Sequence, residues 1–204
     1  MPKARQAFRL KSSNKPGFAK SVTNGPKGPF CFSQFPSDSG ILCFSLFIPN
    51  VMQCHCDSKQ PFPDCCQPFL EGRLEAPDPL TLMRSRYSAY CTGAGEYLVH
   101  TWHPDTLEKL DAATLRESGL STEWLGLNIV FSRGTPADTE GEVEFKVRYR
   151  EHDRVVLLHE RSRFVRFEGR WVYHSGLHNP PKTGPNQPCP CHSGKKYKHC
   201  CNRR

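Results

Sequence analysis

The sequence predicts an α+β fold in which three helices precede a four-stranded antiparallel sheet, with a small cysteine-rich unit on either side. Two observations predict this arrangement. In the part of the chain between the cysteine-rich units, which we call the body, apolar residues recur every three or four positions in the first half and every second position from residue 122 onward. One cysteine skeleton, Cys-x-Cys, eight residues, then Cys-Cys, occurs on both sides of the body, at 54–66 and 189–201. Helices that precede an antiparallel meander typically cover one face of its sheet.

The helical part divides into three segments. Asp78 is an N-cap candidate followed by proline, so we expect a helix over 78–93, ended by glycine. A second short helix is expected over 95–104, where proline stops it. A third is expected over 105–119, with Asp105 as its cap and glycine at its end.

The strands follow from strict alternation. In the second of them, valine, phenylalanine and tyrosine occupy every other position while charged residues lie between. A Glu-Gly pair at 168–169 indicates a tight hairpin between the last two. The expected strands are 122–131, 141–150, 155–167 and 170–176.

Charge is concentrated at the two ends of the chain. Residues 1–50 carry seven Lys/Arg and one Asp, a net +6, and residues 182–204 carry six Lys/Arg and no acid, again +6. The part between, 51–181, is mildly acidic with 15 bases and 19 acids. No stripe of positive charge runs through the body, as a nucleic-acid-binding domain would show. The basic tail favours an acidic partner, whether RNA, the ribosome or a protein surface.

Cysteine usage indicates a reducing compartment. Eight of the eleven cysteines fall in the two skeletons, and adjacent cysteines are poor disulfide partners for each other. No run approaches the roughly 20 apolar residues that a membrane span needs. We therefore expect a cytoplasmic protein without a membrane span.

Residues 1–51 differ from the rest of the chain. The first 37 residues contain no acid and show no helical periodicity. We expect 1–51 to be a disordered or spurious N-terminal extension, with Met52 as the natural first residue. A targeting segment that directs the protein to an organelle is the alternative.

The C-terminal skeleton has the ligands of a zinc knuckle. Zinc prefers four tetrahedral nitrogen or sulfur ligands, and two cysteine pairs close in sequence supply them. We expect Ser193 to cap a short helical turn over 194–200 that returns the second pair to the first. Because all four ligands come from the chain, the site would be structural, with iron as the alternative metal. The predicted ligands are Cys189, Cys191, Cys200 and Cys201, with His192 and His199 near enough to replace one, and Lys195, Lys196 and Lys198 beside them to offset negative charge.

The N-terminal skeleton keeps the spacing but not the basic turn. Ser58 and Phe62 occupy the places of Ser193 and Tyr197. Acids beside the thiols raise their pKa, and Pro63 lacks a backbone donor, so we expect a looser second zinc site here. Reactive vicinal dithiols or a chance cluster are the alternatives. The predicted ligands are Cys54, Cys56, Cys65 and Cys66.

The segment "NQPCPCHSGKKYKHCC" resembles the SEC-C motif, the zinc-binding tail of the SecA translocation ATPase. That family usually has glycine after the second cysteine, where this chain has His192. Glycine relaxes the backbone, so the exchange affects local geometry rather than the ligands. The resemblance implies a docking surface for a chaperone or the ribosome.

The wider pattern "PDPLTLMRSRYSAY…YLVHTWHP…STEWLGL…LHERSRFVRFEGRWVY" is similar to the YchJ family of small bacterial proteins. The resemblance covers about 52–204. It implies a nuclear-transport-factor-2-like cone, three helices on a curved antiparallel sheet, flanked by two small zinc knuckles. The implied divisions are 52–70, 71–180 and 181–204.

A domain of this class encloses a pocket, so a small-molecule carrier or a hydrolase- or isomerase-type enzyme is the alternative function. Alternation over 155–167 separates Glu160 from the neighbouring histidine, which weakens a His–acid pair for proton abstraction. We expect Glu160 instead to form a fold-fixing ion pair with Arg84 or Arg86. The candidate polar residues are Arg84, Arg86, His103, Glu123, His159, Glu160, Arg161 and Arg163.

The leading expectation is a non-enzymatic, zinc-dependent adaptor. Its C-terminal knuckle would dock to an acidic protein or ribosomal surface, and direct RNA binding is a further alternative. The expected partner-binding residues are Lys195, Lys196, Tyr197 and Lys198.

Overall fold

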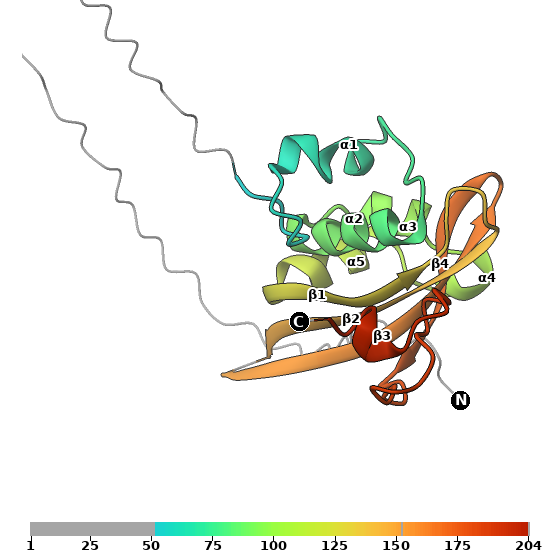
Figure 1. Ribbon diagram of the computed structural model, residues 1–204. Helices are drawn as coiled ribbons and strands as arrows, with labels where there is room; N and C mark the ends of the chain where they lie inside the picture. Colours follow the sequence, from blue (N-terminus) through green and yellow to red (C-terminus); the bar gives the residue numbers. More distant parts are fainter. Residues whose placement is uncertain (1–51, 152, 204) are drawn as a thin grey trace, which may run out of the picture. The chain divides into compact units, whose positions relative to one another are not determined.

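A computed structural model describes residues 52–151 and 153–203 of the chain (Figure 1). The expected extension at 1–51 lies outside these residues. Four strands form one antiparallel sheet in the order β1-β2-β3-β4, as the alternation predicts. Helices lie over one face of the sheet, and the C-terminal segment lies against the other (Figure 1). The α+β class is therefore confirmed.

The strands are longer than the sequence pattern predicts. Strands β2 and β3 pair residue by residue, for example Val143 with Ser162, whereas the other two strand pairs contain register shifts. Glu168 and Gly169 form the expected hairpin with positive φ values of 49° and 82°. The apolar side of β2 is buried, because Val143 and Val147 face the helices with no exposed surface. The bounds are Glu123–Arg133 for β1, Glu140–Glu151 for β2, Arg154–Phe167 for β3 and Arg170–His178 for β4.

Helix α2, Pro79–Thr92, begins and ends as predicted. The side chain of Asp78 accepts a hydrogen bond from the Thr81 backbone N–H at 2.8 Å, which satisfies one free donor of the first turn. Gly93 ends the helix in the left-handed conformation, with φ of 71°. Local capping signals therefore fix both ends of this helix.

Helix α3, Gly95–His100, ends earlier than the proline at position 104 predicts. The next residues pair with the edge strand β4. Tyr173 donates its N–H to Thr101 O and accepts from His103 N–H, both at 2.8 Å. This pairing requires an extended backbone, so the helix cannot continue.

The expected single helix over 105–119 is wrong. The structure has two helices there, α4 at Pro104–Leu107 and α5 at Ala112–Leu120. Glu108 adopts a positive φ of 55°, which breaks the helix after its first turn. The cap of α5 is Asp111, whose side chain accepts from Thr114 N–H at 2.7 Å.

The helices pack closely against each other and against the inner face of the sheet, which is the face turned toward α2. Gly119 of α5 lies where α5 crosses α2, and a side chain there would overlap the carbonyl oxygen of Tyr90. No helix among the described residues is long and apolar enough to cross a membrane. The most deeply buried core side chains include Leu82, Leu98, Leu115, Phe164 and Trp171.

Candidate metal centres

The eight predicted ligands form two clusters. Within each cluster the four Sγ atoms lie within 4.8 Å of one another, which suits a single tetrahedral ion. The first cluster is Cys54, Cys56, Cys65 and Cys66, and the second is Cys189, Cys191, Cys200 and Cys201. We call the loops that carry them, residues 52–66 and 187–201, the N-terminal and C-terminal knuckles.

The two knuckles share one backbone frame. Cys54 donates its N–H to Gln60 O at 2.8 Å, and Cys189 donates to Lys195 O at the same distance. A short 3₁₀ turn follows in each, η2 at Phe62–Asp64 and η3 at Tyr197–His199. The matched spacing in the sequence therefore corresponds to matched structure, although the residues between the cysteines differ.

Position 192 explains why glycine is usual after the second cysteine. His192 has a positive φ of 61°, and its counterpart Asp57 has φ of 60°. Asparagine, aspartate and histidine reach this region at modest cost, and glycine reaches it most easily. Both knuckles thus keep the turn with a non-glycine residue.

The serine between the cysteine pairs contacts a ligand rather than capping a helix. Ser193 Oγ lies 3.1 Å from Cys200 Sγ, and Ser58 Oγ lies 3.1 Å from Cys65 Sγ. The expected helical turn over 194–200 is limited to η3, since Lys196 pairs in extended form with Pro188. The serine hydroxyl therefore orients a ligand sulfur, as outer-shell groups of metal sites do.

The thiols of each cluster are unequal. The hydroxyl of Ser193 lowers the pKa of Cys191 to about 6, while burial raises the pKa of Cys201. In the N-terminal cluster, burial raises the pKa of Cys65 to about 11. Four thiolates this close repel one another unless a cation lies among them. The donor set fits a thiophilic metal such as zinc, which binds as the protons leave.

The N-terminal knuckle is held against helix α2. Cys54 Sγ lies 3.5 Å from Ser88 Oγ, and Arg84 donates to the carbonyl oxygen of Cys56. Three of its four ligands are buried, against one in the C-terminal cluster. Arg84 thus supports a metal loop and does not pair with Glu160. Sequence reasoning missed this role, because only the folded helix brings residues 84 and 56 together.

Pro63 fits the backbone of the N-terminal knuckle. It stands in the first turn of η2, where the missing backbone donor would have no partner in the turn. Asp57 forms an ion pair with Lys59, which offsets one of the two acids. The predicted lower metal affinity of this copy stays a prediction, and the described geometry offers no looser frame for it.

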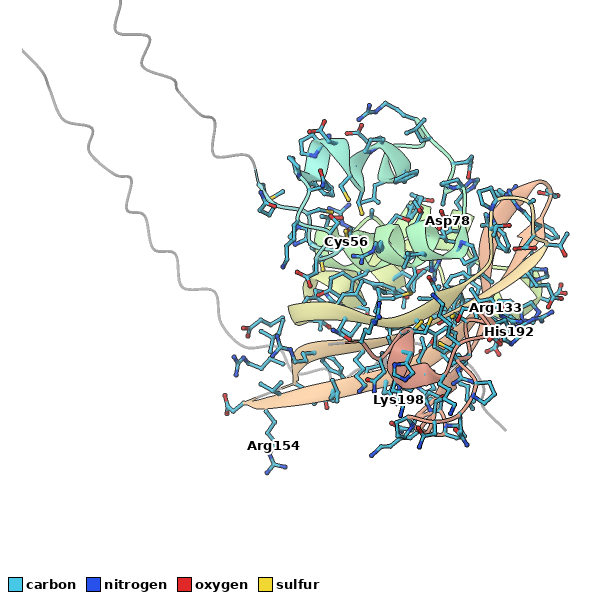
Figure 2. All side chains as sticks on the ribbon, in the orientation of Figure 1. Cys56, Asp78, Arg133, Arg154, His192 and Lys198 are labelled. Carbon is cyan, nitrogen blue, oxygen red and sulfur yellow. The ribbon has the colours of Figure 1, made fainter. Side chains whose placement is uncertain are left out.

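The C-terminal knuckle lies on the outer face of the sheet, which is the face turned away from α2. His192 Nδ1 is 3.4 Å from Arg133 Nη1 at the end of β1, and Figure 2 shows the two residues beside each other. Tyr197 is half-buried, and its pKa is raised by burial and by Glu144 of β2. The knuckle therefore covers the part of the outer face around Glu144.

The three predicted docking lysines are exposed. Lys195, Lys196 and Lys198 form no ion pair with any described residue, and Lys198 projects from the knuckle in Figure 2. Tyr197 differs from them, because it is partly covered by the sheet and the metal loop. The lysines are thus the accessible part of the predicted surface.

The expected ion pair of Glu160 with an arginine of α2 is wrong. Glu160 is 4% exposed, and it accepts from Ser162 Oγ at 2.5 Å and from the Tyr173 hydroxyl at 3.4 Å. His178 Nε2 lies 3.7 Å away. Burial raises the pKa of Glu160. The alternation along β3 did place Glu160 and Ser162 on one face, as predicted.

Arg86 is buried separately from this carboxylate. It donates to Leu98 O at 2.9 Å and to Thr101 Oγ1 at 2.7 Å. Its guanidinium lies over the rings of Trp102 and Tyr173, 5.0 Å from each centroid, and the two rings contact each other edge to face. Cation–π contacts of this kind stabilise a desolvated arginine.

The remaining candidate residues do not converge on one pocket. Glu123 pairs with Arg150, and Arg163 pairs with Glu140, at exposed positions. His103 begins α4 by accepting from Asp105 N–H. His159 and Arg161 both bind Glu144, at 2.8 and 2.7 Å, on the outer face. No nucleophile–base pair results from these positions in the described part of the chain.

Comparisons with known proteins agree with this architecture. A family model described as the YchJ middle NTF2-like domain matches residues 78–176, and the SEC-C motif matches residues 186–203. A UPF0225 protein of Pectobacterium carotovorum is 44% identical over 153 residues, which cover 74% of this chain and 97% of that protein. A UPF0225 protein of Photorhabdus laumondii is 41% identical over 155 residues, 72% of this chain and 97% of that protein.

Two solved structures are similar. The solution structure of a SEC-C motif-containing protein from Rhodopseudomonas palustris has a TM-score of 0.56 and 34% identity, and covers 62% of this chain and 98% of its own. The crystal structure of one from Psychrobacter arcticus has a TM-score of 0.54 and 29% identity, with coverage of 77% and 98%. The resemblance identified in the sequence is confirmed, and the chain belongs to the YchJ family, also named UPF0225.

Proposed function

We propose that this protein is a zinc-dependent adaptor that docks to an acidic protein or ribosomal surface through its C-terminal knuckle. The observation that carries the proposal is the set of three exposed lysines on that knuckle, none of which is paired with a described acidic residue. Unpaired cations on a rigid loop attract an acidic partner and speed its association.

Zinc has a structural part in this proposal. Each knuckle supplies four protein ligands, so no open coordination position is left for a substrate. When bound, zinc would offset half of the charge of the four thiolates and fix the loop that carries the lysines. The chain's own contribution is the orientation of these lysines away from the sheet.

The test is quantitative capture of partners from a native lysate by the full chain with Lys195→Glu, Lys196→Glu and Lys198→Glu. We expect the captured partners to fall at least about tenfold, since several charge contacts are reversed. A matched control reverses three other exposed bases, Lys109, Arg116 and Arg154. Equal capture by the two variants would refute the surface. Retention that instead falls steeply with salt and is lost on ribonuclease treatment would indicate direct RNA binding.

Binding of a small molecule inside the domain is the second candidate. Trp102 Nε1 is buried without a hydrogen-bond partner among the described atoms, close to the guanidinium of Arg86. A buried donor without a partner costs free energy, and a polar ligand could accept from it. A Trp102→Phe variant that lost a ligand found by native mass spectrometry would support this candidate over the adaptor.

A further inference from the structure

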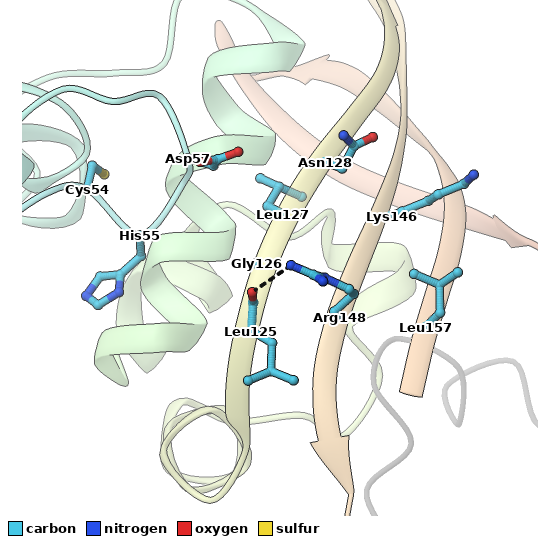
Figure 3. Close-up of a pocket in the computed structure, with 10 residues that line it drawn as sticks. All are labelled: Cys54, His55, Asp57, Leu125, Gly126, Leu127, Asn128, Lys146, Arg148 and Leu157. Carbon is cyan, nitrogen blue, oxygen red and sulfur yellow. Dashed lines mark hydrogen bonds between the residues drawn. The ribbon is translucent and has the colours of Figure 1, made fainter. Parts of the chain in front are cut away.

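A groove of about 430 Å³ lies at the edge strand β1, between the N-terminal knuckle and the outer face of the sheet (Figure 3). The knuckle forms one wall through Cys54, His55 and Asp57. Strands β1, β2 and β3 form the floor, which includes Lys146 and Arg148. Two segments far apart in the sequence therefore meet to make one binding surface.

The groove has two cations without acidic partners. Lys146 and Arg148 alternate along β2, so both lie on the outer face, and neither forms an ion pair with a described residue. Their neighbours on the same face differ. Glu144 binds His159 and Arg161, and Arg150 binds Glu123. On the outer face of β2, the charged side chains without an ion-pair partner among the described residues are therefore the two that line the groove.

Arg148 lies on the groove floor beside Gly126 of β1. Gly126 pairs with Arg148 across the sheet, and its φ of 140° favours a residue without a side chain. Arg148 Nη2 lies 3.5 Å from Leu125 O, so the guanidinium extends from β2 toward β1 in Figure 3. Its other N–H groups remain available, and a guanidinium recognises a carboxylate through two parallel hydrogen bonds.

Apolar side chains adjoin these cations. Leu157 of β3 lines the groove with 56% of its surface exposed, and Val155 next to it on the same face is 57% exposed. Asp57, the acid in the lining, is already paired with Lys59. The groove therefore suits a ligand that combines negative charge with an apolar group.

The chain's own ends cannot provide that charge. Residues 1–50 and 182–204 each carry a net +6, the same sign as the groove. We propose that the groove binds an acidic peptide segment of another protein, with a carboxylate on Arg148 and Lys146 and an apolar side chain on Leu157. This surface is separate from the knuckle lysines, so it goes beyond the docking role proposed above.

The test measures the fluorescence anisotropy of a fluorescein-labelled peptide in which Glu and Leu alternate, titrated with the metal-loaded full chain. We expect Lys146→Glu with Arg148→Glu to weaken binding about tenfold or more, because charge-assisted hydrogen bonds become repulsions. Arg154→Glu is the matched control, since Arg154 is exposed and is not among the residues that line the groove. It should leave the affinity within about twofold, as rim charges contribute little.

Reversal of the three knuckle lysines separates this proposal from the docking role. If that variant still binds the peptide while the groove variant does not, the groove is the site. Equal binding of the peptide by the groove variant and the native chain would overturn the proposal. Tighter binding of a labelled oligoadenylate than of the peptide at the groove would also overturn it. Arg148→Gln replaces the double variant if the latter does not fold, with the same expectation of weaker binding.

Discussion

At the scale of single residues, Glu160 illustrates how the domain keeps a carboxyl group away from water. It lies inside the domain at 4% exposure, and Gly176 on the neighbouring strand β4 leaves room for it, since a side chain there would overlap the carboxylate. Ser162, Tyr173 and His178 surround the carboxyl group, and the Arg86 charge acts from further away. Burial outweighs these favourable contacts and raises the pKa.

We predict that Glu160→Gln raises the free energy of unfolding above that of the native protein, and that this difference grows as pH rises. A raised native pKa means that the folded protein binds this proton more tightly than the unfolded chain, whose carboxyl has the ordinary value of 4.5. The free energy of unfolding of the native protein should therefore fall as pH rises from about 4.5 through the native pKa. Glutamine carries no charge, so this loss should be absent in the variant.

Thermal unfolding of both proteins between pH 4 and pH 8 measures this difference. The gap in melting temperature should widen with pH and then level off. Glu117→Gln, at an exposed carboxylate of α5, should give a gap that hardly changes. A constant or narrowing gap for Glu160→Gln would contradict the prediction.

Sequence reasoning identified site residues whose partners lie nearby in the chain. It did not identify those whose partners lie far away in the chain. The eight cysteines of the two clusters could be identified from the sequence because each cluster lies within thirteen residues, and their spacing predicts a metal site. Arg84 and Ser88 gave no such signal. Their contacts with the N-terminal knuckle arise only after α2 folds against it.

At the scale of elements, the helices depend on close backbone contact. Gly119 of α5 faces the carbonyl oxygen of Tyr90 in α2, and Gly95 of α3 faces that of Ala112. Side chains at these points would push the helices apart, although alanine has the higher helix propensity. Packing between helices therefore requires glycine here.

We predict that Gly119→Ala lowers the free energy of unfolding by about 1–3 kcal/mol, the usual cost of overpacking a tight contact. Denaturant titration followed by circular dichroism measures it. Gly184→Ala is the control, because the nearest atom to a side chain there is 3.4 Å away. If Gly119→Ala instead stabilised the protein, as helix propensity alone predicts, the two helices would be able to separate without cost.

The strands were more predictable than the helices for a physical reason. Alternation in β2 reports burial directly, and Val143 and Val147 are fully buried as expected. The segment 105–119 reads as one helix because its apolar spacing continues across the break. The positive φ of Glu108 that divides it has no local sequence signal, since glutamate usually favours helix.

At the scale of the whole molecule, the two knuckles are attached to different supports. The N-terminal knuckle contacts helix α2 through buried Cys54 and Ser88 and half-buried Arg84. The C-terminal knuckle contacts the sheet through exposed His192, which lies beside half-buried Arg133, and through half-buried Tyr197. Metal bound to the folded state stabilises it by mass action. Loss of metal from the N-terminal knuckle should therefore destabilise the α+β domain more than loss of metal from the C-terminal knuckle.

We predict that the native chain holds two metal ions and that Cys56→Ser and Cys191→Ser each remove one, as measured by elemental analysis. Cys56→Ser should lower the free energy of unfolding by about 3 kcal/mol or more, because the lost ion would lie among buried thiols packed against helix α2. Cys191→Ser should cost less. An equal loss of stability in both variants, or a single ion in the native chain, would contradict this.

The groove shows where prediction from sequence ended. Its wall comes from residues 54–57 and its floor from residues 125–157, and nothing in either segment indicates the other. Fold class and family followed from patterns along the chain. The groove followed only from the way the N-terminal knuckle packs at the edge of β1.

Strand β2 carries one further consequence. Glu144 lies by the C-terminal knuckle and Arg148 lies in the groove, about 13 Å apart at the rise of a strand. Because a sheet strand is stiff, the C-terminal knuckle and the groove keep a fixed separation without a flexible linker. A partner with two acidic segments at matching distance would bind the second as an intramolecular event, at high effective concentration. Avidity of this kind would distinguish one acidic partner from the many acidic surfaces in a cell.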